Sequence, residues 1–421
     1  MIYLDHHATT PVDARVLAAM LPYFTEKFGN AASKQHRFGW DASDAVERAR
    51  KQVAALIGAA SKEIVFTSGA TEANNLAFKG LTRAAEGTGS SEGKRDHIVT
   101  IVTEHKAVLD PVGRLRHEGY RVSVLPVKQD GIVDLNLIAD SITERTLLVS
   151  VMAANNEIGV LQPIKELAAA AHAKGALFHT DAVQAAGKVA FDVEALGVDL
   201  ASLTAHKIYG PKGVGALYVR KKISIAAQIE GGGHERGMRS GTLNVPGIVG
   251  FGAAAEIARS EMATESKRVE ALRNRLLDAL RSKIDGITVN GTMQSRLPGN
   301  LNVSFERVEA DSLIIALRRF SLSSGSACSS GERGPSRVLQ AIGVSEALAM
   351  GSVRIGLGKS NTSEHVHMLV FHPRDAEAPA LQALLDAGWT TTGIVTLSQL
   401  VAFLSFQIRL VTGLRVLASH S

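Results

Sequence analysis

A lysine and an aspartate each follow an apolar run, where a side chain can take part in chemistry. Lys207 lies in AHKIYGPKG, just past 200–204, and Asp181 lies in HTDAVQ, directly after 177–180. Burial lowers the pKa of a lysine amine and makes it a nucleophile toward an aldehyde. The Asp181 carboxylate could pair with a protonated ring nitrogen, or it could simply cap a helix. Gln184 would then lie one turn further on, within reach of a phenolic oxygen of the same ring.

Other polar residues follow apolar runs in the same way. Ala70 and Thr71 lie in SGATEANN, after a run and at the start of a helical pattern. A helix N-terminus attracts a phosphate, although the same residues also fit an ordinary helix cap. His105 in TEH could stack on a flat ring, His206 could bind a phosphate, and Asn156 in NNEIG could hydrogen-bond a ring oxygen.

The chain contains one cysteine, Cys328. One cysteine can form neither an intrachain disulfide nor a cysteine-rich metal site. It lies in SSGSACSSG, whereas a structural cysteine prefers apolar surroundings, so we expect a reactive thiol with Arg333 as its nearby cation. Further along, Arg354 in SVRIGLG could clamp a substrate carboxylate. The glycine-rich RSGT loop that ends at Thr242 could complete a phosphate site.

Strands and helices in regular alternation must position these residues. The predicted strands are 63–67, 97–103, 121–126, 147–152, 177–180, 200–204 and 215–219. The predicted helices between them include 41–56, 73–85, 108–117 and 164–174. This order indicates an α/β fold whose sheet is largely parallel and covered on both faces. Polar motifs follow five of the seven strands, and ligands of such sheets bind beyond the carboxyl ends of the strands.

Composition and charge exclude several classes of protein. The 421 residues are 45% hydrophobic and 21% charged, which is typical of a globular protein and not of disorder or a coiled coil. The formal net charge is only +5 and the basic residues are scattered, so we expect no nucleic-acid partner. The start, MIYLDHHATTPVD, has no secretory signal, and we expect a cytoplasmic protein without a membrane partner.

The motifs together resemble those of the pyridoxal-phosphate-dependent cysteine desulfurases of the aminotransferase class V family. The matching segments run in family order from residue 1 to about 364: YLDHHATTPVD, FGNAAS, FTSGATEANN, TEHKAV, NNEIG, HTDAVQ, TAHKIYGPKG, RSGTLN, SSGSACSSG and SVRIGLG. The resemblance implies aminotransferase fold type I, with a mainly parallel seven-stranded sheet in a large domain and a smaller α/β domain. Residues 16–264 are expected to form the large cofactor-binding domain, and residues 265–369 the small domain, which carries the catalytic cysteine loop at about 321–334. Residues 1–15 are expected to be a segment that packs with the small domain, and residues 370–421 a tail.

The resemblance also implies roles for single residues. Lys207 bonds the cofactor covalently, His105 stacks on its ring and acts as an acid–base, and Cys328 receives the sulfur. Asp181 pairs with the ring nitrogen and Gln184 with the phenolic oxygen. The remaining cofactor contacts are expected from Ala70, Thr71, Asn156, Thr204 and His206, with Thr242 supplied by the partner subunit. Asn156 and Arg354 are expected to bind the substrate amino acid, and no metal is expected.

The implied reaction converts L-cysteine to L-alanine and leaves the sulfur as a persulfide on Cys328, for iron–sulfur cluster assembly. A nitrogenase-linked role is slightly favoured over a housekeeping one. Without a second cysteine the chain has no resolving thiol, so a sulfur acceptor or iron–sulfur scaffold is an expected partner, and Cys328 could briefly meet its cluster. A second copy in a homodimer is also expected. A selenocysteine lyase or another class V aminotransferase is the alternative within the fold, and an inactive sulfur-carrier scaffold is the alternative outside it.

Two features depart from the family pattern. Gly334 stands where the family usually has an acidic residue. The tail, 370–421, resembles the C-terminal helices of carboxymuconolactone-decarboxylase-like proteins, which a gene fusion or a frameshift would explain. We expect two helices, 376–387 and 394–417, without activity of their own. Threonines, serines and glutamines within the uncharged run 387–408 argue against a membrane span.

Overall fold

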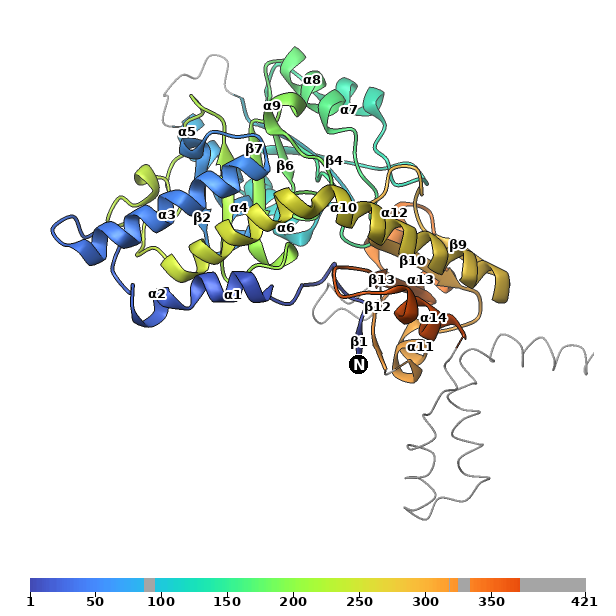
Figure 1. Cartoon of the computed structure of the whole chain (residues 1–421). Helices are drawn as coiled ribbons and strands as arrows, with labels where there is room; N and C mark the ends of the chain where they lie inside the picture. The colour runs from blue at the N-terminus through green and yellow to red at the C-terminus, as the bar shows by residue number, and fades with distance from the viewer. Residues whose placement is uncertain (87–94, 318, 325–333, 372–421) are drawn as a thin grey trace, which may run out of the picture. The chain divides into compact units, whose positions relative to one another are not determined.

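The computed structural model describes residues 1–86, 95–317, 319–324 and 334–371 (Figure 1). The chain divides into two compact units. The larger comprises His7–Ser266 and Gly291–Leu297, and the smaller comprises Met1–His6, Lys267–Asn290 and the residues from Pro298 onward. The sequence predictions for the segment around Cys328 and for the tail from residue 372 therefore lie outside the described residues.

A seven-stranded sheet forms the centre of the larger unit, in the order β2-β8-β7-β6-β5-β3-β4. Its strands are β2 (Ile64–Thr67), β3 (His97–Ile101), β4 (Arg121–Leu125), β5 (Thr146–Ser150), β6 (Leu177–Asp181), β7 (Leu200–Thr204) and β8 (Gly215–Val219). Only β8 runs against the rest, because it pairs antiparallel with both β2 and β7. All seven predicted strands are present, and the expected mainly parallel sheet is confirmed.

The strands are apolar along their length because the sheet is buried. β2, β3, β5, β7 and β8 are buried at every residue, whereas the edge strand β4 is partly exposed. Val65, Ile98, Leu148 and Leu217 belong to one core cluster with helical residues such as Phe78. Parallel strands covered in this way read as continuous hydrophobic runs, which explains why the sequence revealed them.

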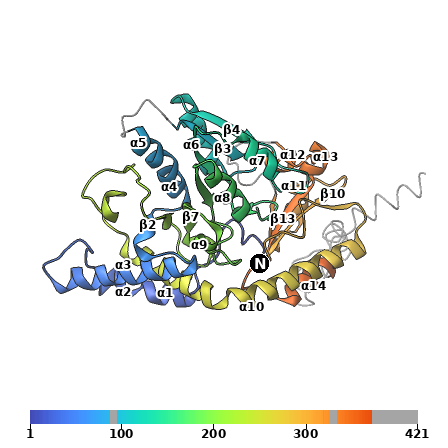
Figure 2. The ribbon, with the colours of Figure 1, turned by 90° about the horizontal axis from the view of Figure 1, so that it is seen from above.

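The helices of the larger unit follow the strands in alternation. They are α1 (Ala14–Met20), α2 (Pro22–Thr25), α3 (Arg37–Leu56), η1 (Ser61–Glu63), α4 (Ala70–Asn75), η2 (Leu76–Gly80), α5 (Leu81–Glu86), α6 (Lys106–His117), α7 (Leu135–Ser141), α8 (Ile164–Ala173), α9 (Val193–Leu196), η3 (Ala205–Lys207) and η4 (Glu235–Gly237). α4, η2 and α5 form one continuous helical stretch in which η2 is a π-helical turn (Figure 2). The long α10 (Val245–Lys283) contributes residues to both units.

The smaller unit is built on an antiparallel sheet in the order β12-β13-β10-β9. Its elements are β1 (Ile2–Tyr3), β9 (Ile287–Val289), β10 (Asn300–Phe305), α11 (Ala310–Ala316), β11 (Phe320–Ser321), β12 (Ser323–Ser324), α12 (Arg337–Ala341), α13 (Glu346–Met350), β13 (Ser352–Gly356) and α14 (Ser363–Phe371). The N-terminal β1 pairs in parallel with β11, so the first residues of the chain belong to this unit.

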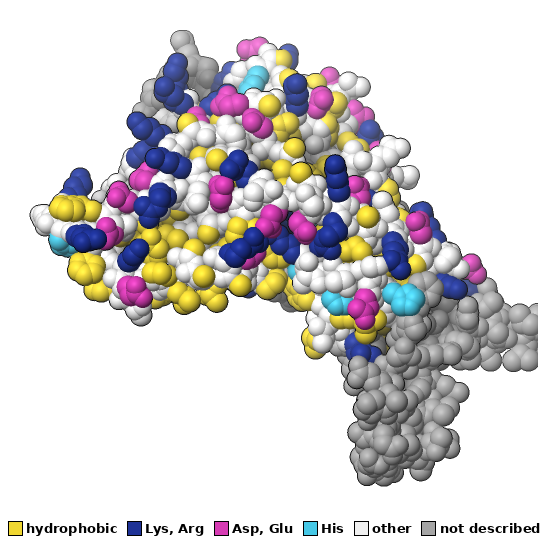
Figure 3. All heavy atoms as spheres, viewed as in Figure 1, with side chains coloured by type: hydrophobic (Ala, Val, Ile, Leu, Met, Phe, Trp, Pro, Cys, Tyr) yellow, Lys and Arg dark blue, Asp and Glu magenta, His cyan; other side chains and the backbone are white. Residues whose placement is uncertain are grey.

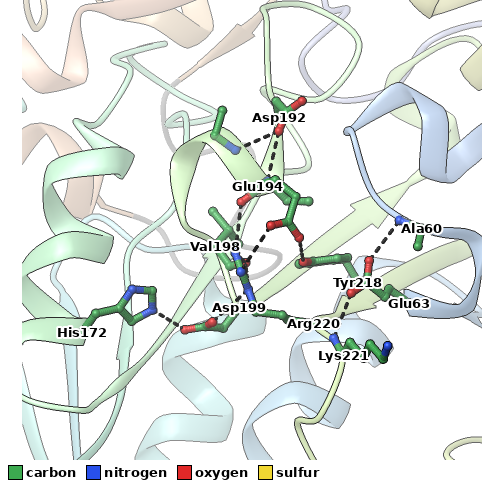
Figure 4. A network of polar contacts seen from close by, with 12 residues as sticks. Ala60, Glu63, His172, Asp192, Glu194, Val198, Asp199, Tyr218, Arg220 and Lys221 are labelled. Carbon is green, nitrogen blue, oxygen red and sulfur yellow. Dashed lines mark hydrogen bonds and ion pairs between the residues drawn. The ribbon is translucent and has the colours of Figure 1, made fainter.

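A network of ion pairs fixes the edge of the large sheet at which β7 begins (Figure 4). Asp199, just before β7, lies 2.7 Å from His172 and 3.1 Å from Arg220, and it accepts a hydrogen bond from the Phe178 amide at 2.9 Å. Arg220 also donates to the Val198 carbonyl at 2.9 Å. Acidic and basic groups are thus matched at this edge, whereas Asp181, Thr204 and Lys207 lie at the other edge, where β6 and β7 end.

Within the described residues, no helix combines the length and the apolar character needed to cross a membrane.

Candidate active site

Lys207 lies at the carboxyl end of β7, in the short helix η3. Its Nζ donates to the carbonyl oxygens of His7, at 2.5 Å, and Ala8, at 2.6 Å. Thr10 holds the same N-terminal segment against η3, because its amide and its hydroxyl both donate to the His206 carbonyl. The position of the lysine amine is therefore set by residues 7–10 as well as by the strand that precedes it.

The His7 carbonyl joins two of the predicted residues. It accepts from Lys207 and, at 2.9 Å, from the Nε2 of Gln184. The amide oxygen of Gln184 in turn accepts from Lys188 at 2.8 Å and lies 3.2 Å from the Nδ1 of His7. Gln184 is 3% exposed, so these contacts fix its orientation.

Asp181 ends β6, beside β7, and is buried. Its Oδ1 accepts from the Val183 amide at 3.1 Å, and its Oδ2 accepts from the Nδ2 of Asn74 at 2.8 Å. The Asp181 main-chain oxygen accepts from the Ala153 amide. Asp181 begins a turn and caps no helix.

Glu104 and His105 end the segment after β3. Glu104 is 1% exposed, and its Oε1 accepts a short hydrogen bond from the Met152 amide. Burial, with repulsion from Asp181, raises the pKa of Glu104 well above its usual range. His105 is the N-cap of α6, where its Nδ1 accepts from the Ala107 amide at 3.0 Å. The ring proton of neutral His105 is therefore on Nε2.

Asn156 lies in a fully buried loop after β5. The neighbouring Asn155 shapes this loop, since its Oδ1 accepts from the amides of Glu157, at 2.8 Å, and Ile158, at 2.9 Å. Its Nδ2 donates to the Thr103 carbonyl at 3.0 Å. Asn155 therefore ties the loop that carries Asn156 to the end of β3.

Ala70 and Thr71 begin α4, directly after Gly69, whose φ is +155°. Gly215 in β8 approaches this turn so closely that an added Cβ would lie 2.7 Å from the Gly69 backbone. Thr204 ends β7, and its hydroxyl donates to the Val214 carbonyl at 3.3 Å. Small residues therefore allow β8 to pack directly against the turn between β2 and α4.

His206 lies beside Lys207 and 3.1 Å from the Thr9 hydroxyl. Burial, together with the positive charges of Lys207, Lys212 and Lys188, lowers the pKa of His206 to about 4. His206 is therefore neutral near pH 7 and can donate or accept a hydrogen bond without adding a charge.

Thr242 is exposed, and among the described residues it forms no hydrogen bond with the residues above. The loop that carries it is firmly anchored. Buried Glu235 pairs with Arg50 through two hydrogen bonds of 2.7 Å and also accepts from the Phe66 amide. Arg239 donates to Glu72 of α4 at 2.8 and 3.2 Å.

In the smaller unit, Arg354 of β13 is 1% exposed and donates to Asp5 at 2.8 Å. Asp5 forms a backbone bridge with Gly356, two residues further along the strand. Gly334, just after the undescribed segment, is exposed, and a Cβ there would meet no atom within 4 Å. The fold therefore leaves room at this position for the acidic side chain that the family pattern has.

The model of the family described as "Aminotransferase class-V" matches residues 2–369. This chain belongs to that family. "Cysteine desulfurase IscS" of Anaeromyxobacter sp. (strain Fw109-5) is 58% identical over 371 residues, covering 88% of this chain and 90% of the relative. The protein of the same name from Rickettsia bellii (strain OSU 85-389) is 53% identical, covering 88% of this chain and 89% of the relative.

Solved structures agree with this membership. A structure titled "NIFS-LIKE PROTEIN" is 40% identical, with a TM-score of 0.81, and the match covers 88% of this chain and 97% of that one. Another, titled "SspA in complex with cysteine", is 36% identical, with a TM-score of 0.76, and the match covers 86% of this chain and 100% of that one. The resemblance read from the motifs is thus confirmed at the level of family and fold.

The residues of this class-V chain fit pyridoxal phosphate. One sheet edge brings together a lysine amine, a buried carboxylate and a buried amide, in Lys207, Asp181 and Gln184. A Cβ at Gly69 would meet no atom within 4 Å, so the start of α4 leaves space for a phosphate close to the backbone. An amine for the aldehyde, a carboxylate for the ring nitrogen and a cradle for the phosphate are the three groups that this cofactor requires.

Three residues of the site had no role in the sequence analysis. His7 contacts both Lys207 and Gln184, Asn74 contacts Asp181, and Glu104 lies next to His105. Each lies in a motif quoted above: YLDHHATTPVD, FTSGATEANN or TEHKAV. The usable signals were Asn74 lying one helical turn after Ala70, on the buried side of α4, and a carboxylate directly after β3 at Glu104.

Proposed function

We propose that this class-V protein is a cysteine desulfurase that converts L-cysteine to L-alanine and passes the sulfur on for iron–sulfur cluster assembly. The observation that carries the proposal is the constellation of Lys207, Gln184 and Asp181 at one edge of the sheet. The curated relatives that are more than 50% identical over most of the chain are named for this activity.

The proposed cofactor is pyridoxal 5'-phosphate. When bound, it supplies an electron-poor ring that can accept negative charge from the substrate. Asp181 would hold a proton on the ring nitrogen, and Gln184 would hydrogen-bond the phenolic oxygen. Ala70, Thr71, Thr204 and neutral His206 would hold the phosphate. Lys207 would form the covalent link.

His105 is placed to hold or move a proton. Because its Nδ1 is occupied by the Ala107 amide, its Nε2–H is the group that can face a ligand. Its neighbour Glu104 is buried, and burial raises the pKa of that carboxyl and so favours its uncharged form.

We propose that Asn156 and Arg354 bind the substrate, each within its own unit. Asn156 is fixed in a buried loop by Asn155. Arg354 is oriented by Asp5, and a guanidinium held in this way can still present a planar fork to the substrate carboxylate. Arg354 is thereby suited to select an amino acid by its carboxylate.

Cys328 is the proposed sulfur acceptor. The bond between the substrate's β-carbon and its sulfur breaks, and the Cys328 thiolate gains that sulfur as a persulfide. The three-carbon remainder takes up protons and leaves as alanine. Because the chain contains no second cysteine, the persulfide must be handed to another protein.

A homodimer is proposed from the surface of the larger unit. Figure 3 shows apolar side chains gathered along the edge formed by α1 and α2. Between the start of α1 and the start of α3, the large apolar side chains that are about half exposed are Leu17, Leu21, Phe24, Phe28, Phe38 and Trp40. Exposed patches of this kind mark protein interfaces. Exposed Thr242 would complete the phosphate site of the second copy.

We also propose a cytoplasmic location, supported by the single cysteine, which suits a reducing compartment. A nitrogenase-dedicated role stays a prediction of the sequence.

The experiment follows sulfide and alanine release from L-cysteine by the full chain with reductant. We expect equal amounts from the wild type and a loss of at least about 100-fold in Cys328→Ala, with the visible absorbance of the bound cofactor unchanged. A matched Lys207→Ala variant should lose the covalent attachment that borohydride reduction fixes in the wild type. Normal turnover by Cys328→Ala would contradict the proposal and favour a lyase or transaminase that needs no thiol.

A further inference from the structure

Asn74 makes a contact that the cofactor chemistry does not require of it. It lies in α4 and is fully buried, at 0% exposure. Its Nδ2 donates to the Oδ2 of Asp181 at 2.8 Å. The other carboxylate oxygen of Asp181 is bonded by the Val183 amide at 3.1 Å. Both oxygens of the carboxylate are therefore held, one from the turn after β6 and one from a separate helix.

The two donors to Asp181 are both uncharged. Buried Glu235 and Asp199 instead pair with Arg50 and Arg220. In the part of the chain that the structure describes, Asp181 forms no ion pair with a cationic side chain. Amide donors fix a carboxylate in space and favour its ionised form, but unlike an arginine they leave its negative charge available.

Asn74 is not fully satisfied by this contact. Its amide oxygen is buried and has no hydrogen-bond partner among the described residues. An unpaired buried acceptor is destabilising, so an apolar residue of similar size would suit the folded chain as well or better. Asn75, the next residue, bonds the Thr71 carbonyl within its own helix and shows the ordinary use of this side chain. Among the described residues, the hydrogen bond to Asp181 is thus the one contact that an apolar side chain at position 74 could not make.

We propose that Asn74 is a positioning residue that orients Asp181 toward the ring nitrogen of the cofactor without neutralising it. This inference rests on the proposed function, because it assigns Asp181 to that nitrogen. The helix that begins at the phosphate residues Ala70 and Thr71 then also sets the far end of the cofactor, through Asn74 one turn later. One rigid element would therefore fix the spacing between the phosphate site and the carboxylate.

The test compares two ligands of the apoprotein, prepared from the full chain. One is pyridoxal 5'-phosphate, and the other is its analogue with a C–H group in place of the ring nitrogen. The ratio of their dissociation constants measures the contact between Asp181 and the ring nitrogen. A hydrogen bond to a charged group is worth roughly 10- to 100-fold in an equilibrium constant. We expect the wild type to prefer the natural cofactor by about this factor, and Asn74→Leu to reduce the preference about tenfold.

Thr82→Val is the matched control. It removes one buried hydrogen bond, from the Thr82 hydroxyl to the Phe78 carbonyl, in the same helical stretch but away from Asp181. It should keep the wild-type preference even if stability falls. Asn74→Ser, whose hydroxyl is too short to reach Asp181, serves if Asn74→Leu does not fold, and it should lose the preference equally.

The outcomes are distinct. A reduction of about fivefold or more in either Asn74 variant, with the control unchanged, supports the proposal. If the preference of the Asn74 variants falls by less than about fivefold, the proposal is overturned, even if both ligands bind more weakly. A purely structural role of Asn74 would weaken the binding of both ligands by the same factor. If the wild type itself shows no preference, the role of Asp181 in the proposed function is wrong and the role of Asn74 fails with it.

Discussion

Replacing Glu235 by glutamine tests whether the buried clamp on the 229–242 loop stabilises the fold. The Glu235 side chain is 1% exposed and the Arg50 side chain 4% exposed, and two hydrogen bonds of 2.7 Å join them. Glu235 also accepts from the Phe66 amide at 2.7 Å, and the Arg50 guanidinium lies 4.7 Å from the Phe66 ring centre. Glu235→Gln keeps the shape but leaves Arg50 as a buried cation facing an amide.

The expected loss follows from the weaker pairing of that charge, because Arg50 keeps its 3.0 Å ion pair with Glu47 but the Glu47 side chain is 55% exposed. Removing one partner of a buried ion pair costs about 3–5 kcal/mol, which corresponds to roughly 6–20 °C in the melting temperature of a unit of this size. Glu235 and Arg236 also have left-handed backbone conformations, with φ of 49° and 58°. Such conformations cost about 1–2 kcal/mol each, so a loosened clamp should also release the loop to proteases.

Urea unfolding of the full chain gives the free energy, and Glu118→Gln is the control. Glu118 pairs with Arg114 at 2.7 Å, but both side chains are exposed and lie four residues apart on α6. An exposed pair of this kind contributes at most about 0.5 kcal/mol. In the double variant Arg50→Met/Glu235→Gln, the total loss should be smaller than the sum of the single losses, because the stranded charge is gone. If the Glu235→Gln and Glu118→Gln variants lose equal free energy, the clamp does not stabilise the fold as argued.

Two further predictions concern buried titrating groups, and both use the free energy of unfolding against pH. Because the pKa of Glu104 is raised in the folded chain, Glu104 stabilises the fold fully below about pH 4.5. This contribution to the free energy of unfolding is lost as the pH rises toward the pKa of Glu104 in the folded chain. Glu104→Gln should therefore gain stability over the wild type by about 1.4 kcal/mol per pH unit in that window, and a constant difference would show that Glu104 is ionised in the fold. Burial lowers the pKa of His179 to about 3, so the folded chain resists a proton that the unfolded chain binds. Its contribution is lost as pH falls from about 6.5 toward 3, and His179→Asn should flatten that fall, whereas an equally steep curve would place the acid sensitivity elsewhere.

The sequence was sufficient for those parts of the fold that depend on local pattern. All seven strands of the large sheet were predicted because buried parallel strands are continuous apolar runs. Lys207 and Asp181 were singled out because each lies just after such a run, with Gln184 one turn after Asp181, and the carboxyl ends of parallel strands meet at one edge. The helix over 73–85 was predicted, but the π-helical turn η2 within it was not, since a π turn leaves no hydrophobic period of its own.

The contacts that hold the site could not be predicted, because they join residues far apart in the chain. His7 meets Lys207 across 200 residues, and Asn74 meets Asp181 across 107. The sequence shows no local partner for either residue, and Asn74 is a polar residue on the buried side of its helix. Only the packing of α4 against the sheet, and of the N-terminal segment against η3, gives them a role.

The two edges of the large sheet treat buried acidic groups differently, and this difference bears on the chemistry. At the edge where β7 begins, Asp199 is matched with His172 and Arg220, so its charge is neutralised and serves the fold. At the edge where β6 ends, both oxygens of Asp181 accept from amides, Asp181 forms no ion pair within the described residues, and burial raises the pKa of Glu104. A single negative charge, fixed in place and not cancelled, is what the ring nitrogen of the proposed cofactor needs. An arginine within reach of Asp181 would instead pair with this carboxylate and remove the electrostatic basis of the proposed reaction.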